Sequence, residues 1–423
     1  MAAAETIHAE APKPAARLAP VAPGDRIFNL DMLRGWAILG ILAVNAITFA
    51  WPIAAGMSEA SRPYALTGAD AWGHWVTDVF FEDKFRTLFT MLFGVSIYLV
   101  GGERFDEARG LLLRSRLFWL AVFGLVHGLA LWCGDILLHY AYCGLIMMVM
   151  RSMKAGKLIW IGGGVTLMWM LLATAGPLAM NAAPVDIMAE VEAGQVGVTV
   201  KDILATVDAY RAGGLSPWIE NAKAWLMVQG FSLFLIPVTI PLMMLGLGLF
   251  KSGFLAGRSP VWVYLLLAAA AAANLWTFAT NAWAEVLAGP DADPTGGLAS
   301  AAAGLAPLVT LGYASLLILM TRFGLRAATS VLAPVGRMAF TNYLTQSLIM
   351  ASLFYLPWGP GWMGTMGPGQ LWGVVGAVWI AQLIWSPLWL SVFSMGPLEW
   401  LWRCLTYGRM VAIRKPAAAS VAL

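Results

Sequence analysis

Three titratable residues, His127, Asp135 and His139, lie in a stretch that is apolar enough to sit in a bilayer. The stretch runs from Arg116 to Tyr142 and reads RLFWLAVFGLVHGLALWCGDILLHYAY. Ionisable side chains at membrane depth are costly to bury, which makes them functional candidates. Steps of four residues place the three groups on one helical face. The Gly-Asp dipeptide predicts a break between two short spans, with Asp135 at or near the turn.

A histidine near its titration midpoint suits general acid–base catalysis or proton transfer. We therefore predict that His127 is the catalytic acid–base group and that Asp135 orients it. A buried neutral histidine held by a hydrogen bond is the structural alternative. Both interpretations place a polar centre inside the membrane.

A second polar group occurs between residues 70 and 94 (DAWGHWVTDVFFEDKFRTLFTMLFG). His74, Asp78 and Glu82 recur every four residues, so that on a helix they form one stripe. One histidine and two carboxylates can supply a general base with orienting partners, which makes His74 a further catalytic candidate. A solvated helix face would show the same spacing.

Polar residues also interrupt the first apolar run, LDMLRGWAILGILAVNAITF. Asp31 and Arg34 are one turn apart, which predicts an ion pair within the helix. Gly35 and Gly40 allow another helix or a ligand to approach closely. Asn45 either bonds a neighbouring helix or holds a substrate carbonyl or hydroxyl.

The segment GRMAFTNYLTQS (336–347) combines a basic residue with a polar stripe. Arg337 at a membrane interface can meet an anionic group such as a phosphate. The stripe either binds substrate or makes hydrogen bonds between helices. It consists of Thr341, Asn342, Thr345 and Gln346.

The composition indicates an all-α, polytopic membrane protein. The 423 residues are 60% hydrophobic and only 12% charged, whereas soluble domains carry about 25% charged residues. The apolar runs are continuous and about 20 residues long, which favours helices over a barrel. A net charge of +3 with scattered basic residues gives no indication of a nucleic-acid partner. No pattern specifies an oligomeric state.

Neither a metal site nor a tightly bound cofactor is predicted. The three cysteines, Cys133, Cys143 and Cys404, lie in or beside apolar segments without metal or disulfide spacing. The sequence also lacks Walker, Rossmann, HExxH and GxSxG motifs.

The positive charges support ten spans with both termini in the cytoplasm. With these spans, 20 of the 26 basic residues lie on one side, as the positive-inside rule requires. We expect one transmembrane domain over 25–415, between a disordered Ala/Pro-rich tail (1–24, without a cleavable signal) and a cytoplasmic tail (416–423). The spans are 33–53, 85–101, 116–133, 136–150, 158–180, 226–250, 261–283, 301–321, 338–357 and 371–394.

The outer connections are expected at 54–84, 284–300 and 358–370, together with one long outer loop at 181–225. Apolar residues recur at roughly helical spacing between Val196 and Tyr210, which predicts an amphipathic helix on the outer surface. This loop is either a functional lid or a passive insert. On the inner side, 396–409 (GPLEWLWRCLTYGR) predicts an interfacial helix.

Several stretches together resemble the YeiB-like family of bacterial inner-membrane proteins, a domain of unknown function. They are RIFNLDMLRGWAILGILAVN (26–45), FRTLFTMLFGVSI (85–97), RLFWLAVFGLVHGLALWCGDILLHYAYCGLI (116–146), GRMAFTNYLTQSLI (336–349) and GPLEWLWRCLTYG (396–408). The resemblance spans nearly the whole chain and implies a multi-pass protein of the bacterial inner membrane.

The opening motif, LDxLRG followed ten residues later by Asn, is similar to that of heparan-α-glucosaminide N-acetyltransferase. It also resembles, more loosely, the membrane acyltransferases that modify surface sugars. By this resemblance Asn45 matches the motif's Asn, and His74 is the nearest match to the catalytic His. The 29 residues between Asn45 and His74 are more than in that motif. His127 is the better-matched histidine within the YeiB-like family.

Two functions remain in competition. In a membrane acyltransferase, Arg34 and Arg337 would meet the phosphates of cytoplasmic acyl-CoA, Asn45 would bind the acyl carbonyl, and His127 or His74 would activate a small-molecule acceptor. In a proton-coupled transporter, His127 and Asp135 would carry the proton. A non-catalytic scaffold explains neither buried group.

Overall fold

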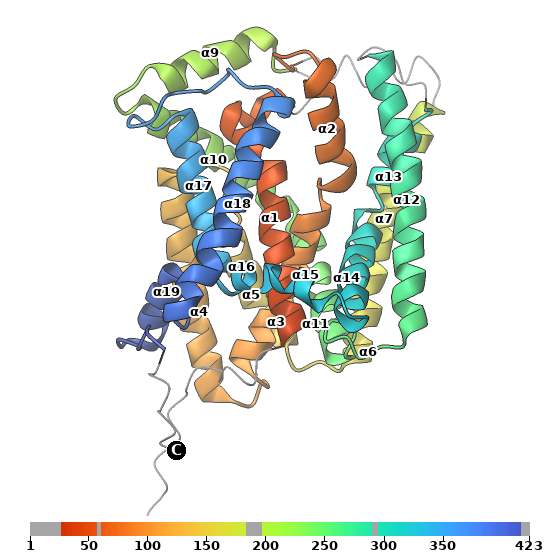
Figure 1. The fold of residues 1–423 in the computed structure, drawn as a ribbon, viewed down its shortest axis with the longest axis vertical. Coiled ribbons are helices and arrows are strands. Elements are labelled where there is room, and N and C mark those ends of the chain that lie inside the picture. Colours follow the sequence, from red (N-terminus) through yellow and green to blue (C-terminus); the bar gives the residue numbers. More distant parts are fainter. Residues whose placement is uncertain (1–26, 57–60, 183–196, 290–294, 416–423) are drawn as a thin grey trace, which may run out of the picture.

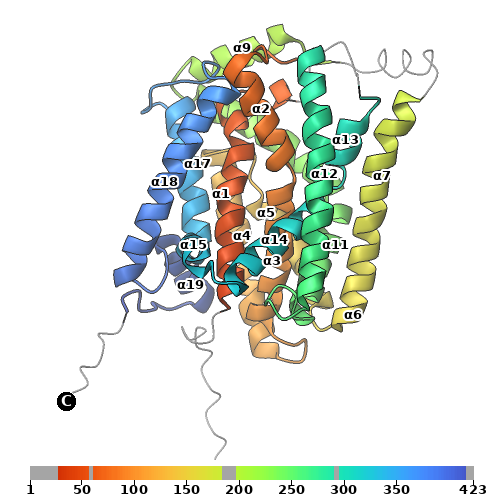
Figure 2. The ribbon, with the colours of Figure 1, turned by 45° about the vertical axis from the view of Figure 1, so that its right-hand side comes forward.

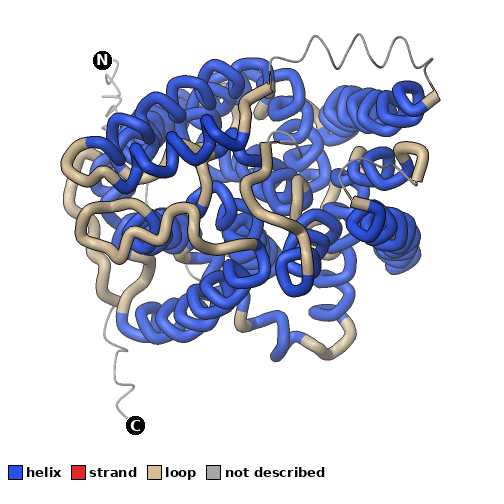
Figure 3. Tube along the Cα trace, turned by 90° about the horizontal axis from the view of Figure 1, so that it is seen from above, coloured by secondary structure: helices blue, strands red, loops and turns tan. Residues whose placement is uncertain are grey.

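The computed structural model describes residues 27–56, 61–182, 197–289 and 295–415. Within these ranges the chain consists of helices and loops (Figure 3), with one isolated bridge between Phe393 and Arg414. The expected tails, including His8, lie outside the described residues. The elements are α1 (Phe28–Ala50), η2 (Ile53–Gly56), α2 (Gly68–Phe80), α3 (Lys84–Gly101), α4 (Glu107–Ala130), α5 (Leu137–Met150), α6 (Ala155–Leu158), η3 (Ile159–Gly163), α7 (Gly164–Asn181), α9 (Val200–Arg211), α10 (Ser216–Phe234), α11 (Ile236–Lys251), α12 (Val261–Ala288), α13 (Leu298–Ala303), α14 (Ala306–Arg322), α15 (Arg326–Ser330), α16 (Leu332–Arg337), α17 (Ala339–Phe354), α18 (Pro368–Val392) and α19 (Pro397–Tyr407).

The apolar runs form a bundle of roughly parallel and antiparallel helices (Figures 1 and 2). Among the described residues, six helical stretches are long and apolar enough to cross a membrane, or seven if the bent pair α10–α11 counts as one span. Helices occupy most of each of the ten expected segments. The fold is therefore that of a helical membrane protein, while the count of ten spans stays a prediction.

Both ends of the described chain lie at the lower end of the bundle, near the start of α1 and the end of α19 (Figures 1 and 2). The helix α9 lies across the opposite end. Its apolar residues Ile203, Val207 and Tyr210 are buried, and Thr199 and Asp202 form a capping box at its start. The amphipathic helix predicted in the outer loop is thus confirmed, apart from residues 183–196, which lie outside the described chain.

Glycines allow the central helices to approach closely. A Cβ on Gly35 of α1 would lie 2.0 Å from the carbonyl oxygen of Leu332, and one on Gly336 would lie 1.8 Å from that of Asp31. Packing of this kind is typical of membrane helices, where small residues let the backbones meet. The close approach predicted at Gly35 is confirmed, and its partner is α16.

The second span differs from its prediction. Residues 54–84 were expected to be an outer connection, yet 68–80 forms α2, and α2 with α3 makes one apolar stretch from Gly68 to Gly101. A turn at 81–83 interrupts this stretch. The Phe85 ring packs against Gly40, near the middle of α1. The charged residues at 82–86 therefore lie deep in the bundle, at the level of the centre of α1.

Other helices are interrupted as well. α10 and α11 meet at a bend of 63°. α13 ends at Ala303 and α14 begins at Ala306. α4 and α5 are joined by the turn 131–136. These breaks bring loop backbone and polar side chains into the bundle, which membrane proteins tolerate where the site is enclosed by protein or lined by water.

Candidate functional site

His127 and Asp135 form a buried pair across the α4–α5 turn. Nδ1 of His127 lies 2.8 Å from Oδ1 of Asp135, and the two residues are only 2% and 3% exposed. The carboxylate also accepts hydrogen bonds from the backbone N–H groups of Leu137 (3.2 Å) and Leu138 (2.9 Å). Asp135 therefore satisfies two of the unpaired donors at the start of α5 while it holds the histidine.

The neighbouring sequence explains why the pair can form. A Cβ on Gly124 would lie 2.4 Å from the nitrogen of Leu138 and 2.9 Å from Oδ2 of Asp135. Only glycine lets α4 pass this close to the start of α5. The Gly-Asp break predicted the position of the turn correctly. The prediction that His127, Asp135 and His139 share one helical face was wrong, because Asp135 lies in the turn between α4 and α5 and reaches back to His127.

The end of α4 is held from above by α10 and α17. Nδ2 of Asn221 donates to the carbonyls of Gly128 (2.7 Å) and Leu129 (3.0 Å). Nε1 of Trp218 donates to the Ala130 carbonyl at 3.1 Å. These bonds satisfy carbonyls that have no partner within the helix. The Tyr355 hydroxyl, just after α17, donates to the Leu131 carbonyl in the same way.

The other nitrogen of His127 is available for chemistry. The Asp135 carboxylate already accepts two backbone N–H groups, so Nδ1 of His127 is the protonated nitrogen and Nε2 carries the lone pair. Nε2 is buried and has no hydrogen-bond partner among the described residues. The ring centre of the buried Tyr343 lies 5.2 Å from that of His127. An oriented imidazole with a free Nε2 is the arrangement of a general base.

His139 belongs to a different network from the one expected. Its Nδ1 lies 2.6 Å from the hydroxyl of Tyr142, and its Nε2 lies 2.7 Å from Oγ1 of Thr239. The Tyr142 hydroxyl continues to Ser232 at 2.7 Å. Both nitrogens are thus engaged, and the network ties α5 to the two helices that meet at the 63° bend. Neither Asp135 nor His127 takes part in it.

The His74 stripe is only partly formed. His74 and Asp78 lie one turn apart on α2, but Glu82 lies in the turn after the helix, so the three do not share one helical face. The His74 imidazole is half-buried and has no hydrogen-bond partner among the described residues. Nζ of the buried Lys84 donates to the carbonyl of Asp78 at 2.8 Å.

The α2–α3 turn carries an ion pair that sequence reasoning did not single out. Asp83 accepts from Nη2 of Arg86 at 2.6 Å and from its Nε at 3.1 Å. Asp83 has φ of 59°, a left-handed conformation that is unusual for a residue with a side chain. Arg86 is near enough to His139 to act on it electrostatically.

The charged side chains of the α2–α3 turn are partly exposed on the surface of the folded chain. The side chains of Asp83 and Arg86 are 53% and 32% exposed, and Glu82 is exposed too. Charged groups facing lipid at the centre of a membrane would be very costly. Asp83 and Arg86 pair with each other, which lowers the cost of placing these charges at this depth. Thr310 donates to the Lys84 carbonyl at 2.9 Å.

Arg34 and Arg337 lie beside the same helix contact. Arg34 precedes Gly35 and Arg337 follows Gly336, the two glycines at which α1 meets α16. Nη1 of Arg34 pairs with Asp31 at 3.2 Å, as predicted, and Nη2 donates to Ser96 at 3.1 Å. Nη2 of Arg337 donates to the Ser394 carbonyl at 3.3 Å.

The remaining predicted residues differ in their surroundings. Asn45 is half-buried on α1, and its side chain makes no hydrogen bond within the described part of the chain. Asn342 donates to Val335 and Ser386 and accepts from Trp385. Gln346 donates to the Ile38 carbonyl and to Gln382. The last two side chains are buried and engaged between helices, which accounts for their polarity without a substrate.

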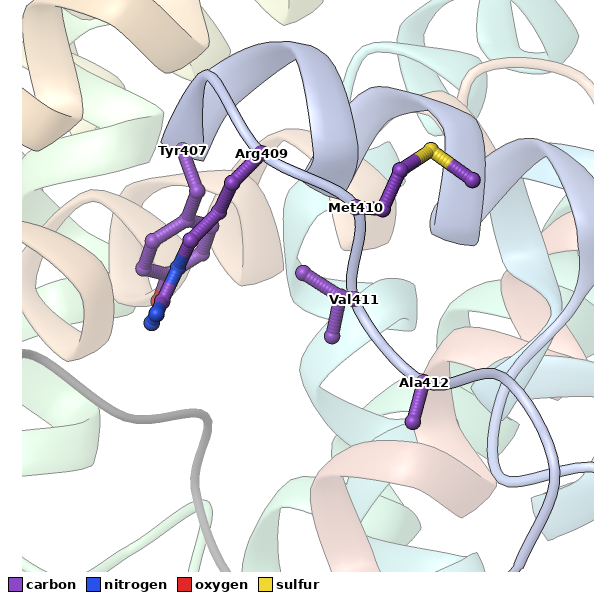
Figure 4. Close-up of a pocket in the computed structure, with 5 residues that line it drawn as sticks. All are labelled: Tyr407, Arg409, Met410, Val411 and Ala412. Atoms are coloured by element: carbon purple, nitrogen blue, oxygen red, sulfur yellow. The ribbon is translucent and has the colours of Figure 1, made fainter.

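Two further features bear on the site. Within the described ranges, no group of three His, Cys, Asp or Glu side chains is arranged to hold a metal. A shallow hollow follows α19, and the Tyr407 and Arg409 side chains lie alongside each other at its edge (Figure 4). One stretch of chain, 407–412, lines this hollow, so it brings no distant residues together.

Comparisons with known proteins agree with the pattern of the chain. Residues 249–409 match the family described as "Protein of unknown function (DUF418)". The uncharacterized protein YeiB of Escherichia coli (strain K12) is 32% identical over 410 residues, which cover 90% of this chain and 96% of the relative. The uncharacterized protein YxaH of Bacillus subtilis (strain 168) is 27% identical over 420 residues, covering 92% and 96%. No solved structure matches. The identity to YeiB over nearly its full length shows that the chain belongs to the YeiB-like family, as its motifs predicted.

Proposed function

We propose that this chain is an integral-membrane acyltransferase of the bacterial inner membrane. It would move an acyl group from cytoplasmic acyl-CoA to a small-molecule acceptor at the outer side. The observation that carries the proposal is the His127–Asp135 pair, because Asp135 holds Nδ1 while Nε2 has no partner. A base that is buried, oriented and unoccupied suits proton abstraction from an acceptor.

The reaction can be written for this arrangement. Nε2 of His127 takes the proton from an acceptor hydroxyl or amine while that oxygen or nitrogen attacks the thioester carbonyl. The new C–O or C–N bond forms as the C–S bond breaks, and the proton then passes from His127 to the departing thiolate, which leaves as the free thiol of CoA. Asp135 stabilises the imidazolium between the two transfers.

Basic side chains near the lower end of α1 suit the donor's phosphates. Arg34 and Arg337 flank the α1–α16 contact, and Arg34 and Arg403 both lie within electrostatic range of Arg116. Asn45, eleven residues after Arg34 on α1, lies about 16 Å further along the helix axis. In this proposal, the phosphate group and the acyl carbonyl of one extended donor bind at these two different depths. His74, on α2, remains the alternative base.

The first test is binding of coenzyme A and acetyl-CoA to the purified full-length chain by calorimetry. We expect saturable binding that weakens in Arg34→Gln and Arg337→Gln. The second test is release of the CoA thiol from acetyl-CoA in the presence of candidate sugar and amine acceptors. His127→Gln should abolish this release while CoA binding persists. Folded protein that binds neither ligand would refute the proposal.

A proton-coupled transporter is the second candidate, because of the interrupted helices. The charged α2–α3 turn and the α10–α11 bend both lie within the bundle, and broken helices often form substrate sites in transporters. The discriminating assay is uptake of labelled sugars and amino acids into proteoliposomes without any acyl donor. Uptake that His127→Gln abolishes would favour this function over acyl transfer.

A further inference from the structure

A groove opens between the lower ends of α4 and α5, at the end of the bundle where the positive-inside pattern places the cytoplasm. Both charged and apolar side chains line it. On α4, Glu107, Gly110, Leu111 and Arg114 follow the spacing of one helical face. The complete lining is Arg104, Asp106, Glu107, Gly110, Leu111, Arg114, Leu145, Met148, Val149 and Arg151.

Arg151 places a fixed positive charge at the bottom of the groove, which we call its floor. It is buried, and it donates to the carbonyls of Gly102 (3.2 Å), Met148 (2.7 Å) and Glu103 (3.4 Å). These bonds hold the guanidinium against the ends of α3 and α5. A Cβ on Gly110 would lie 3.4 Å from Nη2 of Arg151. Because Gly110 has no side chain, α4 passes close to the buried guanidinium, whose charge lies just beneath the groove.

Two exposed arginines stand above this floor. The guanidinium groups of Arg104 and Arg114 make no hydrogen bond or ion pair with any other described residue. Two carboxylates also lie in the groove. Asp106 is committed to the start of α4, where it accepts from the Arg109 nitrogen at 3.0 Å, and Glu107 lies in the first turn. The balance of charge is positive, with three guanidinium groups against two carboxylates.

An apolar surface continues from the groove along both helices. On α4 the exposed residues Leu111, Phe118 and Leu125 recur every seven positions, and on α5 Leu145 and Val149 are exposed. Side chains of this kind at the edge of a membrane bundle face lipid chains. The cations at one end of this surface match the phosphate of an anionic amphiphile, and the apolar track beyond them matches its acyl chains.

We propose that this groove binds one anionic phospholipid of the cytoplasmic leaflet. The phosphate lies between Arg104 and Arg114 above Arg151, and the acyl chains follow the track that begins at Leu111 and Val149. The apolar track favours a lipid over a soluble phosphate, since a soluble anion would leave it uncovered. The site is separate from His127 and does not depend on the proposed acyl transfer.

The test is lipid retention by the purified full-length chain in native mass spectrometry, with phosphatidylglycerol and phosphatidylcholine as probes. We expect phosphatidylglycerol to bind more tightly, and R104Q/R114Q to weaken it about 30-fold, at about 1 kcal/mol for each arginine. K154Q/K157Q is the matched control, because it removes the same charge from exposed lysines at the same end of the bundle. The control should keep the affinity of the wild type.

Three results would overturn the proposal. Equal losses in the two double variants would mean general attraction to a basic surface. Retention of phosphatidylcholine as strong as that of phosphatidylglycerol would mean that the arginines do not select an anionic lipid. Competition by glycerol 3-phosphate or CoA that is as strong as competition by phosphatidylglycerol itself would mean that the groove is a site for soluble anions. A further variant, Val149→Gln, should weaken retention of phosphatidylglycerol and so test the apolar track separately from the charges.

Discussion

Replacing Asp135 by Ala and by Asn should separate its two roles. The carboxylate accepts from Nδ1 of His127 and from the backbone nitrogens of Leu137 and Leu138. Alanine removes all three acceptors inside a buried turn. Asparagine keeps the shape and one acceptor oxygen, but it presents an NH₂ group where the second oxygen was.

The magnitude follows from the bonds that are lost. Loss of the helix cap at the start of α5 costs about 1–2 kcal/mol, and loss of a charge-assisted bond to a buried partner costs about 1.5–3 kcal/mol. Asp135→Ala should therefore lower the free energy of unfolding by about 3–5 kcal/mol. Asp135→Asn should lower it by about 1–2 kcal/mol, because the remaining oxygen still caps the helix.

The histidine tautomer provides an independent measurement. The chain has only four histidines, so ¹⁵N-histidine NMR can be assigned by single substitutions. In the wild type, Nδ1 of His127 should carry the proton. In Asp135→Asn the amide NH₂ donates to Nδ1, and the proton should move to Nε2. If acyl transfer is the activity, this exchange removes the base and lowers the rate by about 10³–10⁴-fold.

The reasoning fails if wild-type His127 carries its proton on Nε2, or if Asp135→Ala unfolds like the wild type. Either result would mean that the carboxylate does not orient the imidazole. Asp208→Ala is a suitable control for the unfolding measurement, since that aspartate is exposed on α9.

Three further predictions concern stability. Asn221→Ala should lower the free energy of unfolding by about 1–3 kcal/mol, because two carbonyls of α4 lose their donor; Asn281→Ala, at an exposed position where the amide bonds within its own helix, should have little effect in the same detergent unfolding assay. Gly35→Ala should separate α1 from α16 and cost about 1–3 kcal/mol or more, whereas Gly176→Ala, with open space around it, should be neutral or slightly stabilising. Burial raises the pKa of Glu399, which accepts from the nitrogens of Phe340 and Thr341 at the start of α17. The folded state therefore binds this proton more tightly than the unfolded state, so unfolding measured against pH should show stability falling as pH rises from 4.5 through the raised pKa, and Glu399→Gln should remove that slope.

The apolar helices could be predicted from sequence because the membrane constrains them so strongly. An apolar run must satisfy its own backbone, so its composition and length identify a helix. The exception was α2, where His74 and Asp78 made the stretch look like an outer connection. Contacts with α18 explain its place in the bundle: the Gly369 nitrogen donates to Asp70, and Trp372 donates to the Gly73 carbonyl. No local pattern shows bonds between residues 299 positions apart.

The candidate site could be predicted only where its residues are close in sequence. His127 lies in the last turn of α4 and Asp135 in the loop that follows, and the Gly-Asp break was enough to predict that loop. Tyr343 was overlooked although it lies within the polar stripe of 336–347, because a tyrosine in an apolar helix is ordinarily packing. His139 bonds Thr239, 100 residues away, and spacing along one helix gave no indication of that partner.

A buried base needs a route to its substrate, and the bonds above His127 indicate where that route opens. The cover is made largely by α10, whose Trp218 and Asn221 donate to carbonyls at the end of α4. Water satisfies such carbonyls equally well once they are exposed, so moving α10 away exchanges hydrogen bonds instead of losing them. On the other flank, Asn342 and Gln346 bind side chains and backbone within the core, where no water replaces them. The 63° bend between α10 and α11 lies at the other end of α10. If acyl transfer is the activity, we expect the acceptor to enter beside α10, so that substitution of Trp218 should change which acceptors react in the CoA-release assay.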